Sequence, residues 1–268
     1  MTRPGLAIYL LGAPRIERDG RPVEVDTRKA IALLAYLAVS GGVHQRETLA
    51  ALLYPDYDQT NARGALRRTL STLHKALQRG ALEITRESVA LSAAAGGWLD
   101  VAEFRRLLAS SKGHPHSLEQ VCPACLVDLE SAVRLYRDHF MAGFGLRDSA
   151  EFDDWQFFQA ESLRQELASA LEKLTRGHAQ QGDYDNAIAY ARRWSALDPL
   201  LEEAHRQLMT LYAWAGQRNA ALRQYRECVR ILEQELSVPP LEETGQLYQV
   251  ILENRLPPPP KPTSKPAV

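Results

Sequence analysis

The sequence of 268 residues is poor in cysteine and has no long hydrophobic run. Its three cysteines are an odd number and too few for a disulfide framework. No apolar stretch approaches the roughly 18 residues of a membrane-spanning helix, and the N-terminus lacks the charged region and cleavage site of a signal peptide. These absences predict a soluble protein of a reducing compartment, the cytoplasm, without a membrane partner.

Common catalytic motifs are also missing. The sequence contains no G-x-x-x-x-G-K-[ST] phosphate loop, and no Ser/His/Asp arrangement or pair of acids stands out in a cleft-like context. We therefore expect no enzymatic activity. The 32 Lys and Arg residues nearly balance the 33 Asp and Glu residues, which excludes a uniformly basic nucleic-acid coat.

The charge is unevenly distributed along the chain. Residues 1–95 contain 13 Lys and Arg against 9 Asp and Glu, a net charge of +4, so the remainder carries −5. Residues 60–79 hold five basic residues and no acid. A small basic unit followed by an acidic one indicates that the two parts have different roles.

The first part predicts strands, three helices and a hairpin. Leu6–Leu11 is a short apolar strand, and Asp19-Gly20 is a hairpin turn between strands 14–18 and 21–25. A helix capped by Asp26 or Thr27 ends at Gly41-Gly42, a second covers 46–54, and a third, capped by Asp58 or Thr60, covers 61–78. Residues 82–91 alternate as a second hairpin that turns at 86–88.

The third predicted helix has an apolar face and a polar, acid-free face. At 100° per residue the apolar face holds Ala62, Leu66, Leu70, Leu73 and Leu77. The other face suits a DNA major groove, because Arg binds guanine edges, Asn binds adenine, and Ser or Thr binds bases or phosphate. With the tip of the second hairpin, the predicted DNA-binding residues are Asn61, Arg63, Arg67, Arg68, Ser71, Thr72, His74, Lys75 and Arg86.

A basic helix taken alone is more often a solvated surface than a DNA-binding element. Here two short helices precede it and a hairpin follows it, and this order favours DNA recognition.

The stretch LLGAPRIERDGRPVEVDTRKAIALLAYLAVSGGVHQRETLAALLYPD, followed by NARGALRRTLSTLHKAL, resembles the OmpR-type winged-helix domain of SARP-like (Streptomyces antibiotic regulatory protein-like) bacterial regulators. Tyr54 stands where that family tends to have tryptophan. The resemblance implies a three-helix core with a C-terminal wing and a third helix in the major groove. The matching residues are Gly12, Asp19, Gly20, Arg28, Lys29, Leu33, Leu34, Tyr36, Leu37, Arg46, Glu47, Leu49, Leu53, Pro55, Ala62, Leu66, Arg67, Leu70 and Leu73.

The second part of the chain repeats with a period of 34 residues, which is tetratricopeptide spacing. Leu174, His178, Gly182, Ala187 and Ile188 recur as Leu208, Tyr212, Gly216, Ala221 and Leu222. This period predicts paired antiparallel helices, completed by helices near 100–110, 126–141, 149–178 and 241–254.

The same part resembles the bacterial transcriptional activation domain that accompanies this winged helix, in LVDLESAVRLYRDHFMAGFGLRDSAEFDDWQ and ILEQELSVPPLEETGQLYQVIL. The resemblance implies a homodimer on direct-repeat promoter sites, recruitment of RNA polymerase and a nucleoid-associated location. The proline-rich composition from Leu256 onward predicts a linker or tail.

A second constellation precedes the repeats. His114 and His116 followed by Cys122 and Cys125 give four potential zinc ligands, and a CxxC pair can chelate one tetrahedral zinc. The spacing is not that of a standard finger, and no second CxxC exists. Two small packing thiols are the favoured interpretation, zinc is the second and a redox pair the third, so no cofactor is assigned.

Taken together, the sequence predicts a mainly α protein with a small β part. The predicted parts are an independently folding winged-helix DNA-binding domain over 1–97, a tetratricopeptide-like helical domain over 98–255 and a proline-rich tail over 256–268. The predicted function is a sequence-specific transcriptional regulator, an activator, that binds double-stranded DNA. The alternatives are a protein-interaction scaffold and a metal- or redox-responsive regulator that uses the CxxC segment.

Overall fold

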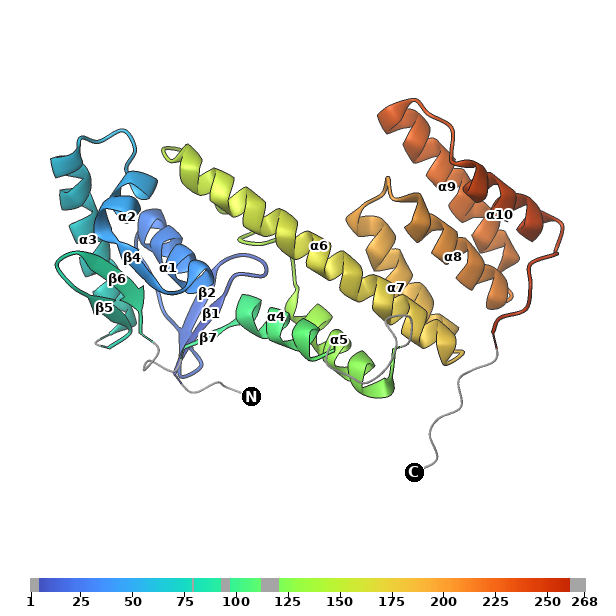
Figure 1. Ribbon diagram of the computed structural model, residues 1–268, viewed down its shortest axis with the longest axis horizontal. Coiled ribbons are helices and arrows are strands. Elements are labelled where there is room, and N and C mark those ends of the chain that lie inside the picture. Colours follow the sequence, from blue (N-terminus) through green and yellow to red (C-terminus); the bar gives the residue numbers. More distant parts are fainter. Residues whose placement is uncertain (1–4, 79, 93–96, 112–120, 261–268) are drawn as a thin grey trace. The chain divides into compact units, whose positions relative to one another are not determined.

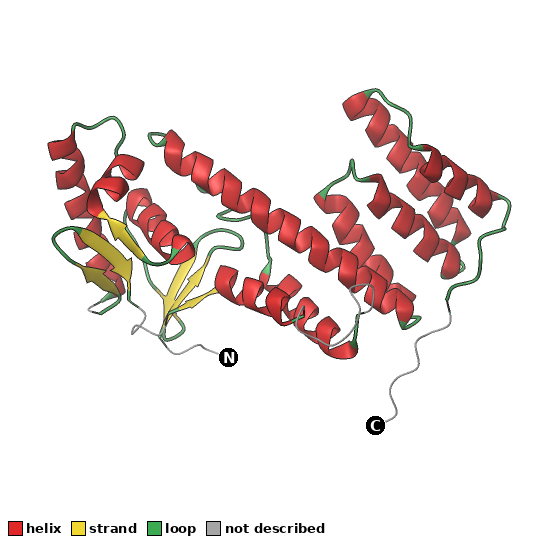
Figure 2. Cartoon of the chain, viewed as in Figure 1, coloured by secondary structure: helices red, strands yellow, loops and turns green. Residues whose placement is uncertain are grey.

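The computed structural model describes residues 5–78, 80–92, 97–111 and 121–260 (Figure 1). Helices make up most of it, and every strand lies in the first hundred residues (Figure 2). The chain forms two compact units. The N-terminal unit comprises residues up to Leu107 together with Arg134–Arg164, and the helical unit comprises Leu108–Val133 and Gln165 onward. The predicted fold class, mainly α with a small β part, is confirmed.

A four-stranded sheet opens the N-terminal unit. Its strands are ordered β3-β2-β1-β7, with β1 (Leu6–Tyr9), β2 (Arg15–Arg18), β3 (Arg21–Pro22) and β7 (Trp98–Leu99). The turn between β2 and β3 has φ values of 51° at Asp19 and 76° at Gly20, the positive pair that a two-residue hairpin needs. Strand β7 pairs in parallel with β1, so the residues directly after 97 belong to this sheet.

Three helices follow: α1 (Arg28–Ser40), α2 (Arg46–Leu53) and α3 (Gln59–Leu77). The Thr27 side chain caps α1 by accepting a hydrogen bond from the backbone N–H of Ala30, and Gly41 ends the helix with a φ of 62°. Asp58 caps α3. The predicted helices are therefore confirmed, and the two undecided caps are resolved to Thr27 and Asp58.

A second sheet of three strands, ordered β4-β6-β5, completes the winged-helix arrangement. Strands β5 (Leu82–Ile84) and β6 (Ser88–Leu91) are the predicted hairpin. Strand β4 (Val43–Gln45) pairs with β6. The sequence does not predict this strand, since three residues are too short to show a period.

Helices α4 (Asp100–Ser110), α5 (Pro123–Leu135) and α6 (Ala150–Gln180) contribute residues to both units. The helix expected over 126–141 instead ends at Leu135. Beyond it, Phe140 bridges to Leu11 and Gly12, and Met141 adopts a φ of 51°. In the N-terminal unit the Trp155 ring contacts those of Tyr36 and Phe140, with centroids 5.1 and 5.8 Å away.

The helical unit continues with α7 (Tyr184–Leu197), α8 (Glu202–Trp214), α9 (Arg218–Leu236) and α10 (Glu242–Leu252) (Figure 1). Residues that are 34 positions apart in the repeat have matching conformation or burial in the structure. Gly182 and Gly216 have φ values of 75° and 73°. The other pairs are buried in both copies: Leu174 with Leu208, His178 with Tyr212, Ala187 with Ala221, and Ile188 with Leu222. Within the described part of the chain, no helix is long and apolar enough to cross a membrane.

Candidate nucleic-acid interface

Helix α3 has the two faces that its sequence predicts. Ala62, Leu66, Leu70, Leu73 and Leu77 are all buried, and the last two are fully so. Burial of this apolar face holds the helix against the core of the unit, and the opposite face remains exposed to solvent.

The outward side of α3 carries Arg67, Arg68, Ser71 and Lys75, and all four residues are exposed. None of these four side chains makes a hydrogen bond or an ion pair with any residue that the structure describes. Three cations within about two turns of a helix that contains no acidic residue can bind an external polyanion at little cost in broken contacts.

Asn61 and Arg63, at the start of the same helix, are already engaged. The Asn61 amide donates to the Asp58 carboxylate, and the Arg63 guanidinium forms an ion pair with Glu47 of α2. Both pairs are exposed, so they are weak and exchangeable. Arg63 and Glu47 are 16 positions apart, so the sequence alone does not predict their pairing, which the fold brings about.

Thr72 and His74 are half-buried, at the edge of the apolar face. The Nδ1 atom of His74 is fully covered and has no hydrogen-bond partner among the described residues. These two predicted site residues therefore lie less favourably for reaching a ligand than Arg67 and Arg68.

The hairpin of β5 and β6 places Arg86 at its exposed tip. The turn is held by the Thr85 hydroxyl, which accepts hydrogen bonds from the backbone N–H groups of Glu87 and Ser88. Arg46, the first residue of α2, donates from its guanidinium to the Thr85 carbonyl at 3.2 Å. The predicted site lacks Arg46 because this residue stands apart from the basic cluster of the third helix in the sequence.

Tyr54, which directly follows α2, contacts both α3 and α1. The Tyr54 hydroxyl lies 2.5 Å from the buried Thr69 hydroxyl of α3, and the Lys29 ammonium lies 5.0 Å from the centre of the Tyr54 ring. Tyr54, which stands where the resembled family tends to have tryptophan, therefore contributes its ring to the Lys29 contact and its hydroxyl to a hydrogen bond with the helix.

The CxxC segment lies in the helical unit. The two sulfur atoms are 3.5 Å apart, and the Cys125 thiol also donates to the Ser111 carbonyl. Burial raises the pKa of the Cys125 thiol to about 11, which disfavours a reactive thiolate. His114 and His116 lie outside the described residues. Among the residues that are described, no three potential metal ligands come together.

Comparison with known proteins identifies the second part of the chain. Residues 99–252 match the family model of the bacterial transcriptional activator domain. The chain is 27% identical over 253 residues to the regulatory protein AfsR of Streptomyces coelicolor. That alignment covers 92% of this chain and 24% of AfsR, so the chain spans about a quarter of its relative.

A solved structure shares the fold. Mycobacterium tuberculosis EmbR, in complex with a low-affinity phosphopeptide, superposes with a TM-score of 0.73 at 22% sequence identity, over 95% of this chain and 66% of EmbR. The winged-helix arrangement followed by helical repeats is therefore shared with EmbR. The family match covers more than half of the sequence and agrees with the resemblance to SARP-like regulators. The chain belongs to the bacterial transcriptional activator domain family.

Proposed function

We propose that the protein is a sequence-specific DNA-binding transcriptional activator whose α3 enters the major groove. The observation that carries this proposal is the exposed, acid-free face of α3, where Arg67, Arg68 and Lys75 have no partner among the described residues. Arginine side chains on such a face bind guanine edges or phosphates. Arg86, at the tip of the β5–β6 hairpin, can add a contact to the neighbouring DNA backbone.

The division of labour proposed for the chain follows the sequence. Residues 1–97 bind DNA, 98–255 act as the activation domain, and 256–268 form a tail. By resemblance to SARP-like regulators, two copies bind a direct repeat near a promoter, and the helical repeats contact RNA polymerase. Such a protein acts on the bacterial nucleoid in the cytoplasm.

The decisive experiment is selection of genomic DNA fragments on the purified chain, followed by sequencing. We expect a recurring motif, and affinity for it that falls as salt rises because bound cations release counterions from the phosphates. Retention of all fragments without a motif would contradict sequence-specific binding. No retention at all, with the repeats still folded, would instead favour a protein-interaction scaffold.

A further inference from the structure

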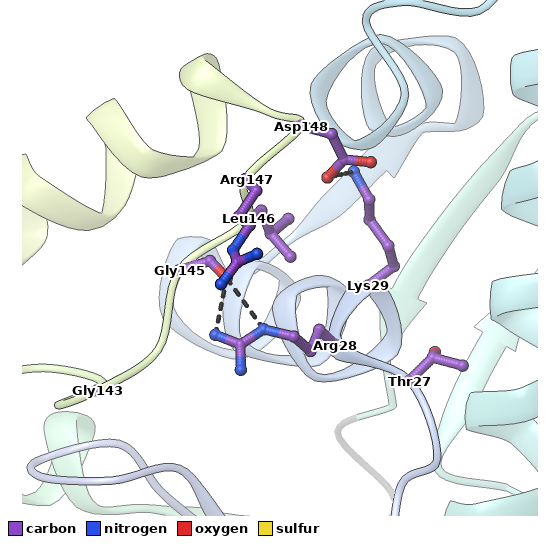
Figure 3. A pocket seen from close by; sticks show the side chains of 8 residues that line it. All are labelled: Thr27, Arg28, Lys29, Gly143, Gly145, Leu146, Arg147 and Asp148. Atoms are coloured by element: carbon purple, nitrogen blue, oxygen red, sulfur yellow. Dashed lines mark hydrogen bonds and ion pairs between the residues drawn. The ribbon is translucent and has the colours of Figure 1, made fainter.

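A pocket of about 680 Å³ lies in the N-terminal unit, between the start of α1 and the segment that leads to α6. Its volume is in the range of small-molecule binding sites. One wall comes from Thr27, Arg28 and Lys29, and the other from residues of 143–148 (Figure 3). This pocket involves none of the side chains assigned to DNA.

Positive charge exceeds negative charge in the lining. Arg28, Lys29 and Arg147 contribute three cations, and Asp148 contributes the one carboxylate. That carboxylate is already neutralised, because it lies 2.9 Å from the Lys29 ammonium. The two guanidinium groups therefore have no counter-charge among the described lining residues.

Arg28 is held in place before any ligand arrives. Its Nε and Nη2 atoms donate to the Gly145 carbonyl at 3.1 and 2.8 Å, and its guanidinium lies 4.6 Å from the centre of the Phe144 ring. No described residue bonds to its third nitrogen, Nη1. A fixed cation loses little conformational freedom when it binds an anion.

Arg147 is exposed and makes no hydrogen bond or ion pair with the described part of the chain. In Figure 3 its side chain extends from the 143–148 segment toward that of Arg28. Two like charges on facing walls of one pocket repel each other, and an anion between them would remove this repulsion.

We propose that this pocket binds the phosphate groups of a small phosphorylated molecule that carries at least two phosphates. Guanidinium groups pair with phosphate oxygens in a bidentate fashion, and two of them match two phosphates better than one. The first turn of α1 contains no acidic residue that would oppose such a ligand. A concave site of this volume suits a compact diphosphate rather than the extended backbone of a duplex.

The test is calorimetric titration of the full chain with pyrophosphate and with adenosine diphosphate, in low-salt buffer without phosphate. We expect one saturable site per chain for at least one of the two probes. Tighter binding of adenosine diphosphate would indicate a nucleotide ligand, and equal binding would indicate recognition of the diphosphate alone. Absence of saturable binding for both would overturn the proposal.

Substitution of Arg147 locates the site. Arg147→Ala should weaken binding about tenfold or more, and Arg147→Lys should lose less, since a cation remains. The melting temperature should not change, because the Arg147 side chain has no hydrogen bond or ion pair with the described residues to lose. Arg193→Ala, which removes an exposed arginine of α7, is the matched control and should bind like wild type.

Unchanged pyrophosphate affinity in Arg147→Ala would count against the pocket. If the same variant also binds random duplex DNA more weakly, Arg147 belongs to a DNA-contacting surface instead.

Discussion

The carboxylate of Asp100 accepts a hydrogen bond at 2.9 Å from the backbone N–H of Leu10, although the two residues are 90 positions apart. The same carboxylate accepts from the N–H groups of Leu11 and Val101, and the Arg137 guanidinium lies 3.7 Å away. Asp100 is 1% exposed. Burial raises the pKa of this carboxyl, against the lowering effect of its three backbone donors and Arg137. The first helix of the family-matched region is thus bonded to the two residues that directly follow strand β1.

Asp100→Asn should destabilise the N-terminal unit by about 1–3 kcal/mol. The asparagine amide would place an NH₂ group against backbone donors that now bond to a carboxylate oxygen, so at least one buried N–H would lose its acceptor. Urea unfolding followed by circular dichroism measures the effect. Asp154→Asn, an exposed aspartate of α6, is the matched control and should stay within about 0.5 kcal/mol of wild type. Equal stability of the two variants would contradict the structural role of Asp100.

Arg67→Ala and Arg68→Ala should weaken binding to a selected DNA site without unfolding the protein. Both side chains are exposed and unpaired among the described residues, so their removal breaks no internal polar contact. Loss of a bidentate base contact costs about 1–3 kcal/mol of discrimination between sequences. Loss of a phosphate contact instead weakens all sequences equally and reduces the salt slope by about one unit. Gel-shift titrations on specific and random DNA distinguish these two cases.

Leu70→Ala provides the contrasting control on the same helix. Leu70 is 3% exposed, and its truncation should cost about 2–5 kcal/mol of unfolding free energy. If both arginine variants bind like wild type, the assignment of α3 as the recognition helix is wrong.

Local features of this fold could be predicted, and long-range ones could not. The helix caps and the turn at Asp19-Gly20 depend on neighbouring residues, so the sequence predicted the turn and restricted each cap to two candidates, of which the structure has Thr27 and Asp58. Strand β4 is only three residues long and forms because β6 offers a partner.

The same distinction between local and long-range features applies to the candidate DNA-binding site. Burial alternates along α3 as its period predicts, so the exposure of Arg67 and Arg68 could be expected. The pairing of Arg63 with Glu47, and the contact of Arg46 with the Thr85 carbonyl, join different elements and depend on tertiary packing. No local pattern encodes such contacts.

The Asp58 cap of α3 should make the stability of the protein depend on pH in acidic solution. The backbone N–H of Asn61, followed by its side-chain amide, lowers the pKa of Asp58 below its ordinary value. A lowered pKa in the folded state means that the stabilising contribution is complete above about pH 4 and is lost as pH falls through the folded pKa. Asp58→Asn keeps an acceptor for the helix but carries no charge. We therefore expect its melting temperature to lie below that of wild type at pH 7 and to approach it near pH 2.

Asp58→Ala, which removes the acceptor altogether, should melt below Asp58→Asn at pH 7. If the difference between wild type and Asp58→Asn is the same at both pH values, the charge of Asp58 does not contribute to the cap.

The extent of the independently stable DNA-binding part can be tested with two fragments. Residues 1–97 hold all three helices and the β5–β6 hairpin, which is why the sequence favours them as a self-sufficient domain. The structure places β7 and Asp100 immediately beyond that boundary. A fragment of residues 1–97 leaves the N–H groups of Leu10 and Leu11 without their acceptor and one edge of β1 unpaired. A fragment of residues 1–107 retains both.

We therefore expect the unfolding free energy of fragment 1–107 to exceed that of fragment 1–97 by about 1–3 kcal/mol, which is the cost of leaving a buried donor unsatisfied. Asp100→Asn in the longer fragment is the informative control. It keeps β7 and the rest of α4, so it should remove the part of the gain that belongs to the carboxylate alone. Urea unfolding of the three proteins gives this division directly. If 1–97 and 1–107 unfold at the same urea concentration, the strand β7 and the Asp100 carboxylate add nothing to the winged helix, and the boundary at residue 97 is the right one.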